Sequence, residues 1–201
     1  MKTFDVERWR GHTPGLMGAK AAYAVLVPIV EEEGREDAIL FEVRAGTLRR
    51  QPGEVCFPGG KMEEGESPAA CALREAEEEL GIPAHAVEVV GEVDFLAHQS
   101  GFLMHPVLAK VKGRGPEWER RNPDEVAETF LVPVSFFEQN PPRVWSYPLE
   151  PCIPEDFPYE ELGISRQYPW RSGKADVPVY VYEGHTIWGL TARIVRHLFG
   201  H

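Results

Sequence analysis

A chain of 201 residues with a formal net charge of −11 is long enough for one sizeable core, and its excess charge is carried by carboxylates. This acidity argues against a broad nucleic-acid surface, because such surfaces neutralise phosphates with Lys and Arg. The composition, 43% hydrophobic and 26% charged, is that of an ordinary globular protein, and no apolar run approaches the roughly 20 residues that cross a bilayer. We therefore expect neither a nucleic-acid partner nor a membrane partner.

The first fifteen residues lack the apolar segment of a secretory signal. Cys56, Cys71 and Cys152 are odd in number and have no CxxC spacing, which argues against a disulfide framework and against a structural zinc site. Reduced thiols fit this pattern best. We expect the protein to work in the cytoplasm.

In chain order, β-branched and apolar runs at 23–30 and 38–44 flank a charged turn and predict paired strands. A loop-like stretch with one short strand near 54–57 follows. A helix is predicted from Ser67 to Leu80, because Ser67 and Pro68 suit its first positions and Gly81 suits its C-terminal stop.

The second half of the chain alternates between strand patterns and short helices. Strands are predicted at 87–97, 102–111, 129–134 and 177–182, a short helix near 135–139, and a closing amphipathic helix at 186–199. The segment at about 141–175 is rich in Pro and aromatic residues and shows little periodicity, so we expect it to be an irregular insertion. Together these patterns predict one α+β domain over residues 1–201.

The predicted helix at 67–80 concentrates negative charge on one side. On a helical wheel of about 100° per residue, Glu75, Glu78 and Glu79 fall within an arc of about 100°, whereas Glu77 points elsewhere. Like charges at such spacings cost a helix roughly 0.2 to 0.5 kcal/mol per pair, and a bound divalent cation would reverse that cost. Hard oxygen ligands of this kind suit Mg²⁺ or Mn²⁺, which usually also bind substrate phosphates.

An isolated run of glutamates is most often a solvated helix face, but here the run belongs to a longer pattern. The residues at the fixed positions of that pattern are Gly60, Glu66, Arg74, Glu75, Glu78, Glu79 and Gly81, with Ala76 and Ile82 in its apolar positions. This arrangement resembles the Nudix box, Gly-x5-Glu-x7-Arg-Glu-U-x-Glu-Glu-x-Gly-U, at every fixed position.

The resemblance to Nudix hydrolases implies an α/β/α sandwich with a mixed β-sheet and cleavage of a nucleoside diphosphate linked to another group. By the same resemblance, Glu75, Glu78 and Glu79 would be ligands of Mg²⁺ or Mn²⁺, and the Gly60 carbonyl would be a further ligand. Arg74 would orient the glutamates. Metal ions in such a site neutralise the diphosphate, lower the pKa of a bound water and stabilise the leaving phosphate.

Residues outside the box resemble one subfamily, the coenzyme A diphosphatases. The segment 47–60 resembles the one that precedes the box in that subfamily, and the segments 100–108 and 187–194 resemble it as well. Two positions depart from the subfamily pattern: Ala45 replaces a serine and Gln51 replaces a histidine. The resemblance implies hydrolysis of coenzyme A or acyl-CoA to 3′,5′-ADP and (acyl-)4′-phosphopantetheine.

Three arginines and one glutamate near the box are candidates for the rest of the site. Arg44, Arg49 and Arg50 could contact substrate phosphates, including the 3′-phosphate of coenzyme A, although each could equally be a surface arginine. Glu125 is the candidate general base or additional metal ligand, because Nudix enzymes often take one from a late loop, and Glu128 is its alternative.

Other interpretations stay open at this stage. The substrate could be ADP-ribose, NADH or another dinucleotide, and a Nudix-fold module could sense a nucleotide without hydrolysing it, although an intact box weighs against the latter. Cys71 could border the metal face or fill the core, as a small hydrophobe does. A homodimer is a further possibility for the assembly.

Overall fold

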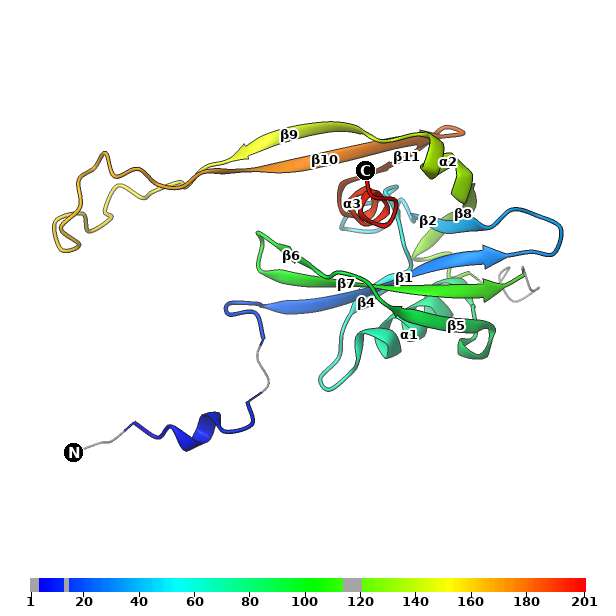
Figure 1. The fold of residues 1–201 in the computed structure, drawn as a ribbon, viewed down its shortest axis with the longest axis horizontal. Helices are drawn as coiled ribbons and strands as arrows, with labels where there is room; N and C mark the ends of the chain where they lie inside the picture. Colours follow the sequence, from blue (N-terminus) through cyan, green and yellow to red (C-terminus); the bar gives the residue numbers. More distant parts are fainter. Residues whose placement is uncertain (1–3, 13–14, 114–120) are drawn as a thin grey trace.

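A large mixed sheet lies between two layers, with helix α1 (Pro68–Leu80) on one face and helix α3 (Gly189–Leu198) with a second, smaller sheet on the other (Figure 1). The computed structural model describes residues 4–12, 15–113 and 121–201. This arrangement confirms the predicted α+β class with a mixed sheet. No helix in the described ranges is long and apolar enough to span a membrane.

The large sheet has eight strands, with β3, β2, β1, β7 and β5 in its main order. Its strands are β1 (Ala21–Glu31), β2 (Ala38–Arg44), β3 (Val55–Cys56), β4 (Gly59–Lys61), β5 (Val87–Glu92), β6 (Leu96–His98), β7 (Phe102–Lys112) and β8 (Val126–Pro133). Strands β1 and β7 run parallel over their whole length, and the other pairs are antiparallel. The smaller sheet holds β9 (Arg143–Leu149), β10 (Gly173–Tyr182) and β11 (His185–Trp188). Short helices complete the fold: α2 (Val134–Gln139), with 3-10 turns at Glu7–Trp9 and Ala84–Ala86.

Both faces of the central strand β1 are buried, because successive side chains of a strand point to opposite faces. Ala24 and Leu26 pack with α1, in a core with Ala72, whereas Val25 and Val27 pack toward α3. This explains why the run at 23–30 is continuously apolar rather than alternating. The sheet therefore buries apolar side chains on both faces, in one cluster on the α3 side and two on the α1 side.

Helix α1 begins and ends as the sequence predicts. The Ser67 hydroxyl accepts a hydrogen bond from the Ala70 N–H at 3.2 Å, and Pro68 occupies the first helical turn. Gly81 ends the helix in the left-handed conformation with φ of 68°, which a residue without Cβ adopts at little cost. These local signals fix the register of the glutamates on α1.

The sequence-based predictions differ from the structure at several elements, among them β4, which lies in a stretch predicted to be loop-like. The segment 141–175 is not wholly irregular, because β9 lies inside it and pairs with β10. The single strand predicted at 87–97 is two strands, and the closing helix begins at Gly189 after strand β11. Strand β9 contains proline and exposed aromatic residues, and both of its faces lie at the surface. Its sequence therefore lacks the alternation of apolar and polar residues from which a strand is predicted.

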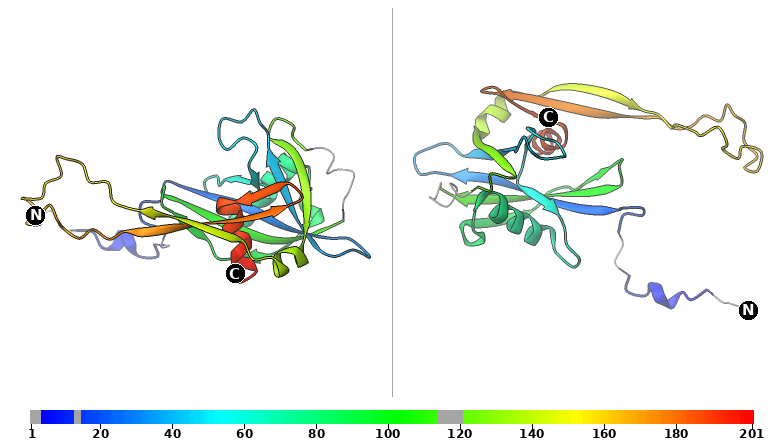
Figure 2. Two further views of the ribbon diagram at one scale, coloured as in Figure 1. Left: turned by 90° about the horizontal axis from the view of Figure 1, so that it is seen from above. Right: turned by 180° about the vertical axis from the view of Figure 1, so that it is seen from behind.

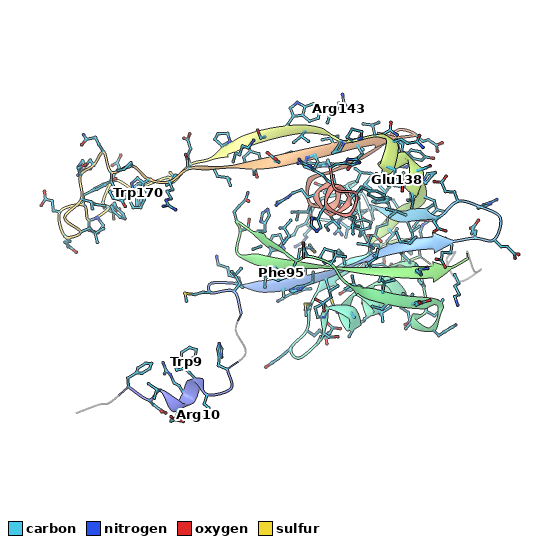
Figure 3. All side chains as sticks on the ribbon, viewed as in Figure 1. Trp9, Arg10, Phe95, Glu138, Arg143 and Trp170 are labelled. Carbon is cyan, nitrogen blue, oxygen red and sulfur yellow. The ribbon has the colours of Figure 1, made fainter. Side chains whose placement is uncertain are left out.

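Strands β9 and β10 form a long hairpin that extends beyond the body of the protein (Figure 2). Its tip, residues 150–172, contains no helix or strand. Trp170 lies among the aromatic side chains at this tip, far from the large sheet (Figure 3). Phe157 packs edge-on against Trp170, with ring centroids 5.5 Å apart, so the tip has a small aromatic cluster of its own.

Phe137 of α2 packs in the core on the α3 side of the large sheet, where it contacts aromatic residues of β2 and β10. Its ring lies 5.1 Å from that of Tyr180 and 6.0 Å from that of Phe41, measured between centroids, and it is fully buried. Phe137→Ala is therefore expected to lower the free energy of unfolding by about 3 to 5 kcal/mol in a denaturant titration. Phe95→Ala is the control, because Phe95 is 63% exposed on the outer surface (Figure 3). Equal losses in the two variants would contradict the assignment of this core.

Candidate active site

Strand β4 packs very closely against strand β1 and helix α1, and one glycine permits each approach: Gly59 toward β1 and Gly60 toward α1. A Cβ on Gly59 would lie 2.4 Å from the Ala24 carbonyl oxygen, and one on Gly60 would lie 2.2 Å from a Glu75 carboxylate oxygen. The Gly59 N–H donates to Glu79 Oε2 at 2.8 Å. Strand and helix thus meet at the point where the glutamates of the box lie.

Arg74 joins the acidic residues of the box to one another. Its guanidinium donates to Glu66 Oε1 at 3.0 Å, to Glu75 Oε1 at 2.8 Å and to Glu78 Oε2 at 3.4 Å. Hydrogen bonding from Arg74 lowers the pKa of Glu66 to about 2. The structure therefore gives Glu66, which sequence reasoning could not place, a contact that holds Arg74 from the loop before α1.

Two buried carboxylates lie behind this exposed network. Glu79 is 6% exposed and Glu42 of β2 is 1% exposed, and burial is the largest cause that raises the pKa of each. Each carboxylate also raises the pKa of other groups, because Glu42, Glu75, Glu79 and Glu125 repel one another. One oxygen of Glu42 accepts from the Cys56 thiol at 3.1 Å, whereas the other is buried without a hydrogen-bond partner in the described part of the chain.

Sequence reasoning missed Glu42. The signal was a single carboxylate inside the apolar run of strand β2, between Phe41 and Val43. A charged residue is rarely fully buried without a partner, so this position was a candidate for function.

A pocket of about 690 Å³ opens beside these carboxylates. Its walls come from β1, β3, β4, β7, β10 and α3 and from the loop that follows β2. The residues that line it include Arg44, Leu48, Arg50, Gln51, Gly60, Glu79, Phe102, Met104, Glu125, Trp188, Leu190, Thr191 and Arg193. The volume lies within the usual range of ligand pockets, about 300 to 1,000 Å³.

The three candidate arginines differ in their position relative to the pocket. Arg44 and Arg50 line the pocket, and Arg44 Nε is buried without a hydrogen-bond partner among the described residues. Arg49 is exposed and does not line the pocket. The structure thus brings two of the three arginines to the site.

Of the two candidate glutamates, Glu125 lies just before β8 and lines the pocket, whereas Glu128 lies within β8 and does not. Glu125 lines the pocket, and its carbonyl accepts from the Ala45 N–H at 2.7 Å, which ties its loop to the end of β2. Nearby, the Asn122 N–H donates to the Glu79 carbonyl at 2.8 Å. Glu128 instead contacts His185 at 3.2 Å and is not part of the pocket. Geometry therefore favours Glu125.

The positions of Cys71 and Glu79 modify the picture drawn from the helical wheel. Cys71 is fully buried, and burial raises the pKa of its thiol to about 11. It packs in the core under α1, and its thiol also lies 3.6 Å from the Gly60 carbonyl oxygen and 3.6 Å from Arg74, so it fills the core at the border of the carboxylate site. Glu77 is exposed, as the wheel predicts, whereas Glu79 is buried and Glu78 keeps 59% of its side chain exposed.

The donor set suits a divalent cation. Carboxylates with the Gly60 carbonyl are hard oxygen ligands, and an ion would relieve the repulsion among the buried carboxylates. Within the described residues, no three Asp, Glu, His or Cys side chains already converge in a metal-binding arrangement. Arg74 engages Glu75 and Glu78, and the Gly59 N–H engages Glu79, so these contacts would be exchanged for an ion.

Comparison with known proteins identifies the family of this chain. The family model described as the NUDIX domain matches residues 20–149. An uncharacterized Nudix hydrolase NudL of Yersinia enterocolitica is 36% identical over 192 residues, covering 92% of this chain and 84% of the relative. A NudL of Yersinia pestis is 35% identical over 180 residues, covering 87% of this chain and 76% of the relative.

Solved structures of Nudix proteins are more distant. A Nudix hydrolase from M. smegmatis, RenU, is 24% identical with a TM-score of 0.44, and the match covers 57% of this chain and 72% of that one. The family match and the relatives define the class: the chain belongs to the Nudix family. It is an enzyme, a Nudix diphosphatase, and enzymes of this family act on small nucleotide-linked substrates with divalent metal ions.

The buried charge of Glu42 gives a stability prediction for the metal-free protein. Because burial raises its folded-state pKa, stability is retained below the ordinary pKa of 4.5 and is lost as the pH rises through the raised value. Glu42→Gln removes this loss. It is expected to be more stable than wild type by about 1 to 3 kcal/mol at pH 8.5 and nearly equal at pH 4, measured by urea denaturation in chelator.

The control for this measurement is Glu138→Gln, because Glu138 is exposed on α2 (Figure 3). It should change the free energy of unfolding little at either pH. A Glu42→Gln protein that is less stable than wild type at pH 8.5 would show that the ionised Glu42 carboxylate does not destabilise the folded protein.

Proposed function

We propose that the protein hydrolyses the diphosphate of coenzyme A or an acyl-CoA, giving 3′,5′-ADP and (acyl-)4′-phosphopantetheine. One observation carries this proposal: the segments that resemble coenzyme A diphosphatases line one pocket. Leu48 comes from the segment before the box, Phe102 and Met104 from the second segment, and Trp188 and Thr191 from the third. Segments far apart in sequence thus meet beside the carboxylates of the box.

In this proposal Glu75, Glu78, Glu79 and the Gly60 carbonyl would hold Mg²⁺ or Mn²⁺, which when bound would supply positive charge to the diphosphate and a bound water of lowered pKa. Arg74 positions Glu75 and Glu78 through its contacts at 2.8 and 3.4 Å.

The other pocket residues act on the proton and on the substrate. Glu125, exposed at the pocket wall, takes the proton of the attacking water as general base or serves as an additional ligand. Arg44 and Arg50 contact substrate phosphates, because both are cationic and line the pocket. Arg49 lies outside the pocket and would act only at its rim.

We further propose that the enzyme works in the cytoplasm, where thiols stay reduced. Its three cysteines, Cys56, Cys71 and Cys152, are all free, which supports this location. The acidic net charge of −11 supports a small nucleotide as the partner rather than nucleic acid or a membrane. A homodimer stays a proposal for the assembly.

The metal site gives a prediction that separates catalysis from folding. Glu79→Gln and Glu78→Gln are expected to lower kcat by at least a hundredfold in Mg²⁺ or Mn²⁺ while changing the free energy of unfolding by less than about 2 kcal/mol. Glu77→Gln is the matched control, since Glu77 is exposed on the same helix, and its kcat should be nearly unchanged. Equal losses for Glu77→Gln and Glu78→Gln would rule out the assigned metal face.

Substrate identity is tested by product analysis on CoA, acyl-CoAs, 3′-dephospho-CoA, NADH, ADP-ribose and diadenosine polyphosphates. Wild type should cleave CoA or acyl-CoA with the highest kcat/KM. Arg44→Ala or Arg50→Ala should lower kcat/KM by roughly ten- to a hundredfold, because a charge-assisted contact is worth about 1.5 to 3 kcal/mol. Arg49→Ala should lower it less.

A higher kcat/KM for ADP-ribose or NADH would refute the coenzyme A proposal and leave the Nudix assignment intact. Gln51 would then be the first residue to change, because it lines the pocket at the position where the subfamily pattern has a histidine. Ala45 is buried, so its departure from the subfamily serine alters packing rather than the pocket wall.

A further inference from the structure

A second pocket, of about 660 Å³, lies under the β9–β10 hairpin and has the opposite charge character from the protein as a whole. It is bounded by β6, by α3 and by the facing ends of β9 and β10 (Figure 1). Its lining consists of Ala97, His98, Gln99, Leu149, Lys174, Ala175, Asp176, Arg193, Arg196, His197 and His201. Three permanent cations and one carboxylate therefore face this pocket, in a chain whose net charge is −11.

The single carboxylate, Asp176, is already shared between two of the cations. Its oxygens lie 3.5 Å from Arg196 and 3.7 Å from Lys174. Arg193, by contrast, has no carboxylate partner and makes no hydrogen bond among the described residues, although it is half-buried. A half-buried arginine without an anion is unfavourable unless a ligand supplies one.

The three histidines of the pocket carry no negative charge that could pair with Arg193. Burial and the nearby charge of Arg193 lower the pKa of His98. His197 contacts the exposed Asp94 at 3.0 Å, and a ring nitrogen of His201 lies 2.8 Å from the Phe137 carbonyl. The excess positive charge is therefore centred on Arg193.

The basic pocket adjoins the active-site pocket. Residues that line both are His98, Gln99, Ala175, Asp176 and Arg193. Gln99 Nε2 donates to the Tyr147 hydroxyl at 2.9 Å, so the β6–β7 turn is joined to β9 beside the two pockets. A ligand in the active-site pocket can therefore extend an anionic group toward Arg193.

We propose that the basic pocket binds a phosphate monoester of the substrate, separate from the diphosphate that is cleaved. This inference rests on the proposed function for the identity of that group, which in coenzyme A is the 3′-phosphate. Arg193 is the principal contact, and Lys174 and Arg196 add positive charge. Arg44 and Arg50, which lie near the carboxylates of the box, then serve the diphosphate.

Phosphate is the ligand class that this cluster fits best. A phosphate monoester carries between one and two negative charges near neutral pH and offers three acceptor oxygens, which match several cationic donors. An arginine fork binds such a group through two parallel hydrogen bonds. A neutral ribose hydroxyl in the same place would leave Arg193 without an anion.

The kinetic test compares CoA with 3′-dephospho-CoA. Arg193→Ala should lower the ratio of the two kcat/KM values by roughly ten- to a hundredfold, and Arg193→Lys should restore part of it. The matched control is Arg35→Ala, because Arg35 pairs with Glu32 in the exposed β1–β2 turn and should leave the ratio unchanged. An unchanged ratio in Arg193→Ala would overturn the inference.

A binding measurement without metal separates this inference from the proposed function. Calorimetry should show that wild type binds adenosine 3′,5′-bisphosphate at least ten times more tightly than 5′-AMP, and that Arg193→Ala removes the difference. Equal affinities in wild type would overturn the basic pocket as a phosphate site. A preference for the bisphosphate in an enzyme that does not cleave CoA would keep the site and reject coenzyme A as the substrate.

Discussion

The close packing of α1 on β4 is the constraint on which the rest of the site depends. Gly60 has no Cβ, so the helix can approach until Glu75 lies against it and Glu79 accepts a hydrogen bond from the Gly59 N–H at 2.8 Å, whereas Gly59 lets β4 lie close to β1. This approach places the glutamates of the box, the Gly60 carbonyl and the pocket mouth in one small region. A larger residue at Gly60 would displace the Glu75 carboxylate.

The packing of α1 on β4 concentrates negative charge, and this charge destabilises the metal-free protein. Burial and mutual repulsion raise the pKa values of Glu42, Glu75 and Glu79, which shows that their ionised forms are disfavoured without a cation. Arg74 offsets part of the cost by contacting Glu66, Glu75 and Glu78 at once. A divalent ion supplies the remaining compensation, and the same stress that weakens the apo protein favours metal binding.

The 21 Lys and Arg residues of this chain are outnumbered by 32 Asp and Glu residues, so the places where cations gather carry information about the ligand. Arg44 and Arg50 lie in the carboxylate pocket, and Lys174, Arg193 and Arg196 lie in the neighbouring pocket under the hairpin. The β9–β10 hairpin thus has a role close to the body, where it helps to form both pockets. Its tip, with its own aromatic cluster, lies away from both pockets (Figure 2).

Sequence alone determined the features that depend on local spacing. The caps of α1, the register of Glu75, Glu78 and Glu79, and the continuous apolar run of β1 are set by neighbours within a few residues, and the structure reproduces them. Tertiary structure alone decided which distant residues meet. Glu42 joined the site because the sheet brings it close to Glu79, Glu125 was separated from Glu128 by the direction of β8, and Arg193 faced the pocket only when α3 packed under β10. Such meetings depend on sheet order and helix packing, which no local spacing encodes.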